Sequence, residues 1–212
     1  MMVCATVMFA GCNKDEAANG GGQTAAGWVD LGLPSGLLWA KCNLGATTPE
    51  GYGDYYAWGE TATKDEYYWD TYKYCNNGDY YHLTKYNNSR TTLEAMDDAA
   101  AQKLGSGARM PTKAEWEELI NNTTAEWTTM NGVNGCKFTA SNGNSLFLPA
   151  AGYRDGSELY HAGSYVDHWS SSLDGSYPYC GAWTFWFVES GLDMYVSFRY
   201  CGKSVRPVRS AR

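Results

Sequence analysis

Residues 109–149, RMPTKAEWEELINNTTAEWTTMNGVNGCKFTASNGNSLFLP, contain the change from helix to strand that decides the fold class. Thr112, with Glu115 three residues later, forms a capping box that predicts the start of a helix. Trp116, Leu119 and Ile120 give this helix an apolar stripe. Asn-Gly pairs at 131–132, 134–135 and 142–143 then predict hairpin turns, with strands at 136–140 and 145–149. A helix followed by hairpins predicts an α+β fold.

The segments before this stretch extend the same domain toward the N-terminus. Residues 28–31 and 37–40 are predicted strands, separated by the turn residues Pro34-Ser35-Gly36. Residues 59–91 are polar and rich in tyrosine, which predicts a long loop with little regular structure. Residues 92–104 predict a helix capped by Thr92 and ended by Gly105.

The C-terminal third, residues 152–209, mixes two kinds of residue. Tryptophan, glycine and arginine positions, among them Trp169, Trp183 and Arg199, suit a fixed framework that we expect to be buried. Between them lie Tyr, His, Asp, Ser, Val, Phe and Cys without a period of 2 or 3.6. Tyrosine gives a large contact area at low entropy cost, and small polar residues give adaptable hydrogen bonds. The pattern is typical of a binding surface.

The N-terminus predicts export. Residues 3–11 are apolar but too short for a membrane span of about 20 residues. Phe9-Ala10-Gly11-Cys12 resembles a bacterial lipobox, which predicts a lipoprotein signal at 1–12 with lipidation of Cys12 and a flexible tether at 13–26. Met1-Met2 departs from the pattern because it carries no basic residue. Asp15-Glu16 resembles the surface-export signal of some Gram-negative lipoproteins. We therefore expect an outer-membrane lipoprotein that is exposed at the cell surface.

Composition narrows the partners. The formal net charge of −7 argues against nucleic acid, whose phosphates need a basic surface. Removing Cys4 with the signal and lipidating Cys12 leaves an odd number of cysteines, so at least one thiol is expected to stay unpaired. These cysteines are Cys42, Cys75, Cys136, Cys180 and Cys201. None stands at CxxC spacing, and His82, His161 and His168 are scattered, so neither a metal nor another cofactor is expected.

Six segments occur in an order that resembles one family. They are VDLGLPSGLLWAKCNLGAT, GDYYAWGET, RMPTKAEWEEL, LPAAGYR, HWSSS and SVRPV. Together they resemble the fibrobacter major paralogous (FISUMP) domain, a branch of the C-type lectin-like fold, over about residues 27–209. The resemblance implies one domain at 27–212, with two helices on a small mixed or antiparallel sheet, long loops, and residues 28–31 paired with 204–208.

Within that family the chain most resembles the target proteins of diversity-generating retroelements, which carry a C-terminal variable region. Here that region would cover about residues 153–203 and bind protein or glycan targets. Adenine mutagenesis of AAY codons gives NNY codons, which cannot encode Trp, Met, Lys, Glu or Gln. The predicted ligand-binding residues are all compatible with NNY: Tyr160, His161, Val166, Asp167, His168, Tyr177, Tyr179, Cys180, Thr184, Val188, Leu192, Tyr195, Val196, Ser197, Phe198, Tyr200 and Cys201. Of these, Tyr195, Ser197, Phe198 and Tyr200 are expected to be exposed.

Two other functions remain open. A lipoprotein with a fixed glycan-binding or adhesion-type surface has the same aromatic composition, although the calcium-dependent lectin tripeptides Glu-Pro-Asn, Gln-Pro-Asp and Trp-Asn-Asp are absent from the sequence. RMPTKAEWEEL also resembles a stretch of formylglycine-generating enzymes, which use C-terminal cysteines. Cys201 is near the position that this resemblance implies, but no second cysteine follows it. We therefore expect a binding protein and not an enzyme.

Overall fold

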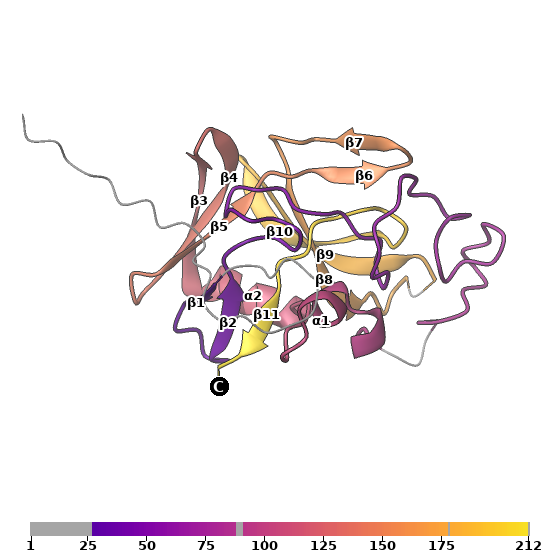
Figure 1. The fold of residues 1–212 in the computed structure, drawn as a ribbon, viewed down its shortest axis with the longest axis horizontal. Helices are drawn as coiled ribbons and strands as arrows, with labels where there is room; N and C mark the ends of the chain where they lie inside the picture. The colour runs from indigo at the N-terminus through magenta and orange to yellow at the C-terminus, as the bar shows by residue number, and fades with distance from the viewer. Residues whose placement is uncertain (1–26, 88–90, 178, 212) are drawn as a thin grey trace, which may run out of the picture.

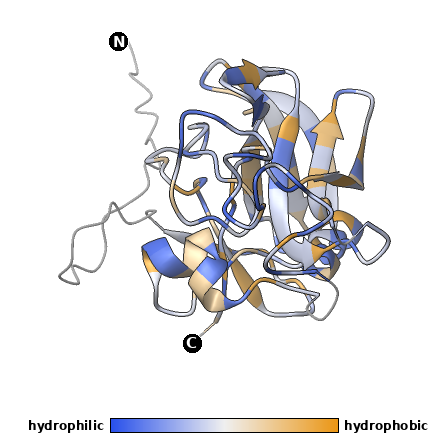
Figure 2. Ribbon diagram, turned by 90° about the vertical axis from the view of Figure 1, so that its right-hand side faces the viewer, coloured by the Kyte–Doolittle hydropathy of each residue, from blue (hydrophilic) through white to orange (hydrophobic). Residues whose placement is uncertain are grey.

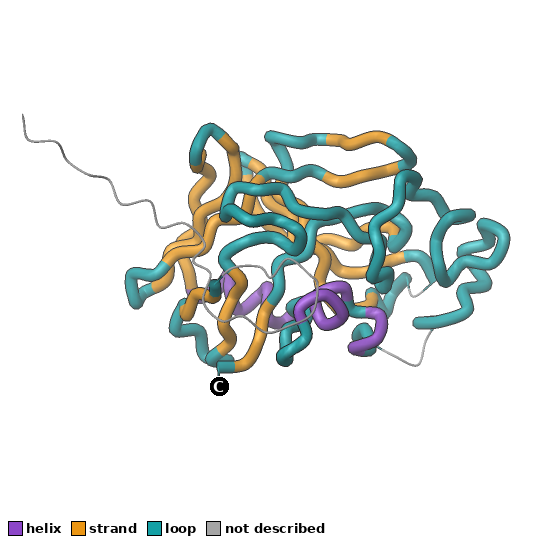
Figure 3. The backbone as a smooth tube through the Cα atoms, viewed as in Figure 1, coloured by secondary structure: helices purple, strands orange, loops and turns teal. Residues whose placement is uncertain are grey.

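The computed structural model describes residues 27–87, 91–177 and 179–211. The predicted lipoprotein signal, Cys12 and the tether lie outside these residues. The described part is a mixed α+β structure with two α-helices, one 3-10 helix and small antiparallel sheets (Figure 1). Loops occupy much of the half of the molecule that carries residues 59–87, as Figure 3 shows. Among the described residues, no helix is both long and apolar enough to cross a membrane.

The two ends of the domain meet in one sheet of order β1-β2-β11. Strand β2 (Leu37–Ala40) pairs with β1 (Trp28–Asp30) on one side and with β11 (Val208–Ser210) on the other. The predicted direct pairing of 28–31 with 204–208 is therefore wrong. The side chains of the central strand β2 are mostly buried, and residues 201–207 run through the interior before β11. The Pro207 carbonyl accepts from the Ala40 N–H at 2.8 Å, which continues the pairing of the C-terminal segment with β2.

The predicted long loop at 59–91 is confirmed for its described residues, which contain no helix or strand. It is nevertheless part of the core. The hydroxyls of Tyr67, Tyr72 and Tyr74 are buried and donate to backbone carbonyls at 2.7–3.0 Å. Such bonds satisfy the carbonyls that a buried loop would otherwise leave without a partner. Tyrosine is abundant here because each ring fills the core while its hydroxyl binds backbone.

The predicted helix at 92–104 begins later than expected. A 3-10 helix (Ala95–Asp97) precedes α1 (Ala99–Leu104), and Asp98 caps α1 by accepting from the Ala101 N–H at 3.0 Å. Thr92 is instead paired with Ser172 in an isolated β-bridge. Gly105 ends the helix as predicted, with φ of 58°, and its N–H donates to the Ala101 carbonyl. Asp98 thus takes the place of Thr92, the predicted residue, as the N-cap of this helix.

The predicted capping box at the start of α2 (Lys113–Asn122) is confirmed. Thr112 Oγ1 accepts from the Glu115 N–H, and the Glu115 carboxylate accepts from the Thr112 N–H. Arg109 also donates two bonds to that carboxylate, at 2.7 and 2.5 Å. Trp116 and Leu119 are buried, so α2 packs its apolar stripe against the sheet of β8, β9 and β10.

Strands β3 (Thr123–Met130), β4 (Val133–Ala140) and β5 (Ser145–Pro149) form a meander. Asn131 and Gly132 make the predicted two-residue turn, both with positive φ as a type I′ turn requires. The turn at 142–143 is also confirmed, between β4 and β5. The turn predicted at 134–135 is wrong: both residues belong to β4. Gly135 is needed there because a Cβ would lie 2.3 Å from the Leu148 carbonyl oxygen.

The last sheet has the order β10-β9-β8, and a two-stranded hairpin stands apart from it. The strands of this three-stranded sheet are β8 (Val166–Leu173), β9 (Gly181–Val188) and β10 (Gly191–Phe198). The hairpin is formed by β6 (Tyr153–Asp155) and β7 (Glu158–Tyr160). Hydropathy changes from residue to residue along several strands (Figure 2), as expected where the two sides of a sheet face different surroundings.

Two buried clusters hold these parts together. One joins α2 to β2, β5 and β9 around Trp39, Trp116 and Phe185. The other joins the long loop to the end of the chain around Trp58, Tyr72 and Trp169. The second cluster therefore fixes the loop next to the C-terminal third, which carries most of the predicted site.

Candidate ligand-binding face

The two sides of the β8-β9-β10 sheet differ in burial. Leu192 and Met194 of the edge strand β10 pack against the cluster around Phe185. Tyr195, on the opposite side of β10, is 60% exposed. Its partner across the strand pair is Thr184, and Trp186 lies two residues further along β9 on the same side. This side of the sheet turns Tyr195 and Trp186 toward solvent.

A row of aromatic side chains leads away from Trp186. Its edge meets the Tyr165 ring, with 5.9 Å between the centroids, and Tyr165 stacks on His161 at 4.0 Å. The row continues through Tyr153 to Tyr160, which face each other across the β6–β7 hairpin with 5.9 Å between their rings. His161 and Tyr160 are exposed and the other rings are half-buried. Residues from three segments of the chain thus form one row.

A second row joins β10 to the long loop. Phe198 is 52% exposed and stacks on Tyr200 at 5.8 Å, and the edges of both rings contact Trp69. Trp69 stacks on Tyr80 at 5.4 Å. The row then continues through Tyr81 to Tyr179. The loop therefore supplies about half of the rings in this row.

The two rows meet at the β6–β7 hairpin. The Tyr200 hydroxyl donates to the Asp155 carboxylate at 3.4 Å, and Asp155 belongs to the same strand as Tyr153. We call the two rows together the aromatic face. It consists of Trp69, Tyr80, Tyr81, Tyr153, Tyr160, His161, Tyr165, Tyr179, Trp186, Phe198 and Tyr200, and Tyr195 lies beside it on the same side of the sheet as Trp186.

The predicted ligand-binding residues divide into three groups by exposure. Exposed side chains belong to Tyr160, His161, Tyr177, Tyr179, Tyr195 and Phe198. Half-buried side chains belong to Cys180, Val188, Leu192, Val196, Ser197 and Tyr200. Ser197 and Tyr200 are thus less exposed to solvent than predicted. Buried side chains belong to Val166, Asp167, His168, Thr184 and Cys201. For these five, the prediction of a ligand-facing position is wrong.

The buried polar members serve the fold. Asp167 forms an ion pair with Lys203, and both side chains are at most 5% exposed. The Thr184 hydroxyl donates to the second Asp167 oxygen at 2.5 Å and lies 2.8 Å from the His168 carbonyl oxygen. A buried carboxylate needs such partners because its desolvation is costly. The pair Asp167–Lys203 therefore anchors the C-terminal segment on β8.

His168 belongs to a second buried network. Asn43 Oδ1 accepts from Arg206 Nε at 3.0 Å and lies 2.9 Å from His168 Nε2, which donates to it. Burial, together with the nearby charges of Arg206 and Lys203, lowers the pKa of His168 well below its ordinary value. The ring is therefore neutral near pH 7. Arg206 also donates to the Ala40 and Phe147 carbonyls, which ties the chain end to β2 and β5.

The framework residues behave as expected with one exception. Trp169 and Arg199 are fully buried. Trp183 is only half-buried, because its ring lies on the outer part of the helix-facing side and the Lys113 ammonium covers it at 4.0 Å. Gly202 is required by space, since a Cβ there would lie 2.5 Å from the Tyr67 ring.

Sequence reasoning missed the loop residues Trp69, Tyr80 and Tyr81 and, in the late segment, Tyr153 and Tyr165. The tyrosine-rich composition of 59–91 was the available signal, but it does not reveal that this loop packs beside β10.

The cysteines among the described residues do not form a second candidate site, either as a reactive thiol or as part of a metal site. Cys75, Cys136, Cys180 and Cys201 form no disulfide with another described residue; Cys136 and Cys201 are buried, as is Cys42, and Cys75 and Cys180 are half-buried. Burial raises the pKa of Cys201 to about 11, so its thiol is protonated near neutral pH. No group of three or more His, Cys, Asp or Glu side chains within the described ranges could hold a metal ion.

Comparison with protein-family models, with curated proteins and with solved structures finds no match for this chain.

Proposed function

We propose that this chain is a surface-displayed lipoprotein that binds a protein or glycan ligand through the aromatic face. The observation that carries the proposal is the position of the exposed large hydrophobic side chains. Nine are present among the described residues, and six of them lie between 159 and 198: Leu159, Tyr160, Tyr177, Tyr179, Tyr195 and Phe198. Exposed aromatic side chains are enriched at interaction sites.

The fold that we propose is C-type lectin-like. Three features support it: the chain ends meet in one sheet, α2 packs on the late strands, and long loops flank the C-terminal third. In this arrangement the buried networks around Asp167 and His168 hold the late strands, while side chains such as Tyr160 and Phe198 stay exposed. Such a division allows the surface to change without loss of the fold.

We further propose that a retroelement diversifies this surface. Burial then limits the diversified positions to the exposed and half-buried members of the predicted set. Thr184 and Asp167 fit NNY codons, but their buried bonds would not tolerate free variation. Tyr195 and Phe198 fit both conditions. The variable set is therefore smaller than the codon rule alone allows.

Sequencing the DNA next to the gene tests this proposal. We expect a reverse transcriptase and a near-identical template repeat that differs from the gene at adenines. The differences should fall in the codons of residues such as Tyr195 and Phe198 and be rare in those of Thr184 and Asp167. A neighbourhood without a template repeat would refute diversification and leave a fixed binding surface.

A fixed glycan-binding surface is the second candidate. The row of rings from Tyr160 through Tyr153 to Tyr165 favours it, because successive rings at one surface can stack on successive sugar units. Binding of the purified domain to a glycan array, compared with the variant Tyr160→Ser, tests this candidate. A ligand lost in the variant would support it, and no bound glycan would count against it.

The lipid anchor has its own test. Cells that express the full chain should incorporate labelled palmitate into the protein, and Cys12→Ser should abolish the label. Protease added to intact cells should degrade the wild-type domain if it is displayed at the surface. Label retained in Cys12→Ser would contradict the lipobox.

A further inference from the structure

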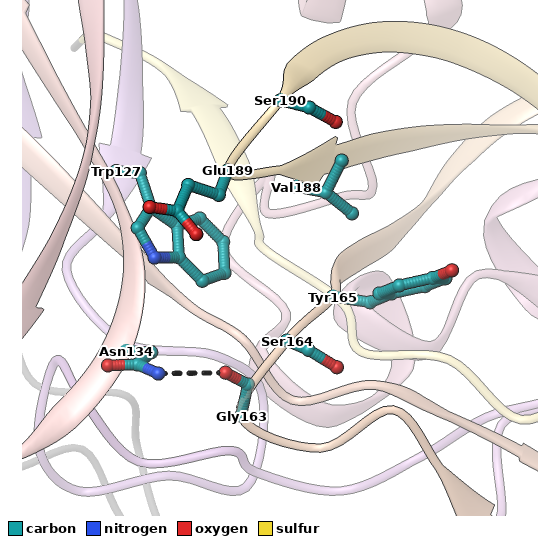
Figure 4. A pocket seen from close by; sticks show the side chains of 8 residues that line it. All are labelled: Trp127, Asn134, Gly163, Ser164, Tyr165, Val188, Glu189 and Ser190. Atoms are coloured by element: carbon teal, nitrogen blue, oxygen red, sulfur yellow. Dashed lines mark hydrogen bonds between the residues drawn. The ribbon is translucent and has the colours of Figure 1, made fainter.

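A pocket of about 520 Å³ opens beside the aromatic face (Figure 4). Eight residues line it: Trp127, Asn134, Gly163, Ser164, Tyr165, Val188, Glu189 and Ser190. They come from β3, β4, the segment before β8, the end of β9, and the turn between β9 and β10. Tyr165 belongs to the first aromatic row, so the pocket lies at one end of the face.

Two aromatic rings form walls of this pocket. Trp127 is half-buried and packs against Phe187, with 5.6 Å between the centroids, which fixes the indole in place. Tyr165 is held by His161 on one side and by Trp186 on the other. In Figure 4 the two rings lie at opposite sides of the pocket. Fixed aromatic rings attract a cation that lies over their faces.

Several polar groups of the pocket can accept a hydrogen bond. Ser164 Oγ already donates to the His161 carbonyl at 3.0 Å, so its lone pairs remain for an incoming donor. The Gly163 carbonyl accepts from Asn134 Nδ2 at 2.9 Å and has a second lone pair. Glu189 adds a carboxylate, shown beside the Trp127 ring in Figure 4. Glu189 forms no ion pair with another described residue.

The charge of the lining has one sign. None of the eight lining residues is Lys, Arg or His, and Glu189 is the ionised one. An anion would therefore meet the Glu189 carboxylate, whereas a cation would meet an opposite charge, hydrogen-bond acceptors and the Trp127 ring. The formal charge of −7 on the whole chain attracts cations as well.

We infer that this pocket binds a lysine or arginine side chain of the ligand. The inference rests on the proposed function, since it names the chemistry of the ligand that the aromatic face receives. Trp127 lies outside the variable region, and neither its codon nor that of Glu189 can arise from NNY. The pocket is then a constant anchor beside residues that vary, and it selects basic protein segments over neutral glycans.

The experiment follows the indole N–H resonance of Trp127, assigned with the variant Trp127→Phe, in the isotopically labelled protein. The probes are N-acetyl-arginine amide, N-acetyl-lysine amide, the uncharged isostere N-acetyl-citrulline amide, and the methyl glycoside of N-acetylglucosamine. The two cationic probes should shift this resonance in a saturable way. Citrulline and the glycoside should bind at least about fivefold more weakly, the factor expected from one exposed cation–π contact with an ion pair.

Two variants separate local from general electrostatics. Glu189→Gln, at an exposed turn, should weaken arginine binding about fivefold without lowering the melting temperature. Glu126→Gln is the matched control, because Glu126 is exposed, precedes Trp127 on β3 and points to the other side of the strand. Glu126→Gln removes the same charge. It should leave arginine binding within about twofold of wild type, because salt screens the interaction between an exposed charge and a cation bound on the other side of the strand.

Three results would overturn the inference: equal binding of citrulline and arginine, tighter binding of the glycoside, or equal losses in the two glutamate variants. Failure of the proposed function gives a different result. In that case substitutions at Tyr195 and Phe198 would leave the binding of every ligand of the domain unchanged. The titration that follows the Trp127 resonance would still show whether the pocket binds a cation.

Discussion

Tyr195 and Thr184 face each other across β10 and β9, yet one is 60% exposed and the other is fully buried. A surface that accepts diversity must tolerate change at the first position and resist it at the second. The test pair is Tyr195→Thr and Thr184→Val. Threonine keeps a strong preference for strands, and valine keeps the shape of the threonine that it replaces.

The structure sets the expected magnitudes. The Tyr195 side chain forms no hydrogen bond or ring contact with another described residue, so Tyr195→Thr should change the free energy of unfolding by about 0.5 kcal/mol or less. Thr184→Val removes the 2.5 Å bond to the Asp167 carboxylate. A lost hydrogen bond to a buried charged group costs about 1.5–3 kcal/mol. The ion pair with Lys203 remains, so the domain should still fold.

Thermal denaturation measures the difference. For a domain of this size the Thr184→Val loss corresponds to about 3–12 °C in melting temperature, and the Tyr195→Thr change to at most about 2 °C. Thr184→Ser keeps the hydroxyl and should recover most of the loss. If the melting temperature falls equally in Tyr195→Thr and Thr184→Val, the division between a fixed interior and a permissive surface is wrong.

Other substitutions test the framework and its ionisation. Trp116→Ala should lower the free energy of unfolding by about 3–5 kcal/mol, because the buried indole stacks on Phe185 at 4.8 Å. Thr112→Ala should lower it by about 1 kcal/mol through loss of the helix cap. Urea denaturation measures both changes. Burial opposes ionisation of Glu115, but bonds from Arg109 and Thr112 outweigh it and lower its pKa below 4.5. The resulting stabilisation is present above pH 4.5 and is lost as the pH falls through the lowered pKa. Arg109→Met should flatten this part of the curve of stability against pH. An unchanged curve would contradict the role of Arg109 in lowering the pKa of Glu115. Cys201, with a pKa of about 11, should react with a thiol reagent at pH 8 more slowly than in the unfolded chain, and equal rates would show that it is accessible.

Short-range features of the fold were predictable from the sequence. The capping box at Thr112 and the Asn131-Gly132 turn both agree with the structure. Each depends on interactions among residues within a few positions of one another, so the local sequence contains the necessary information. The α+β class follows from the same short-range patterns.

Prediction failed where a distant segment changes the outcome. Asn134-Gly135 has the composition of a turn, but Leu148 of the neighbouring strand lies against Gly135 and keeps it in β4. Thr92 could cap a helix, but its backbone pairs with Ser172 and leaves the cap to Asp98. In both places a contact across the chain outweighs a local preference, which no window of sequence contains.

The sequence by itself determined the helix and hairpin pattern and the concentration of aromatic residues in the C-terminal third. Only the tertiary structure decided which of those residues reach solvent. Thr184 and Tyr195 are both compatible with a varied surface and lie on the same side of the sheet, but burial depends on which part of that side another segment covers, and here the C-terminal segment with Lys203 covers Thr184. The same physical reason brings Trp69 from a distant loop to Phe198, because packing joins residues that the chain keeps far apart.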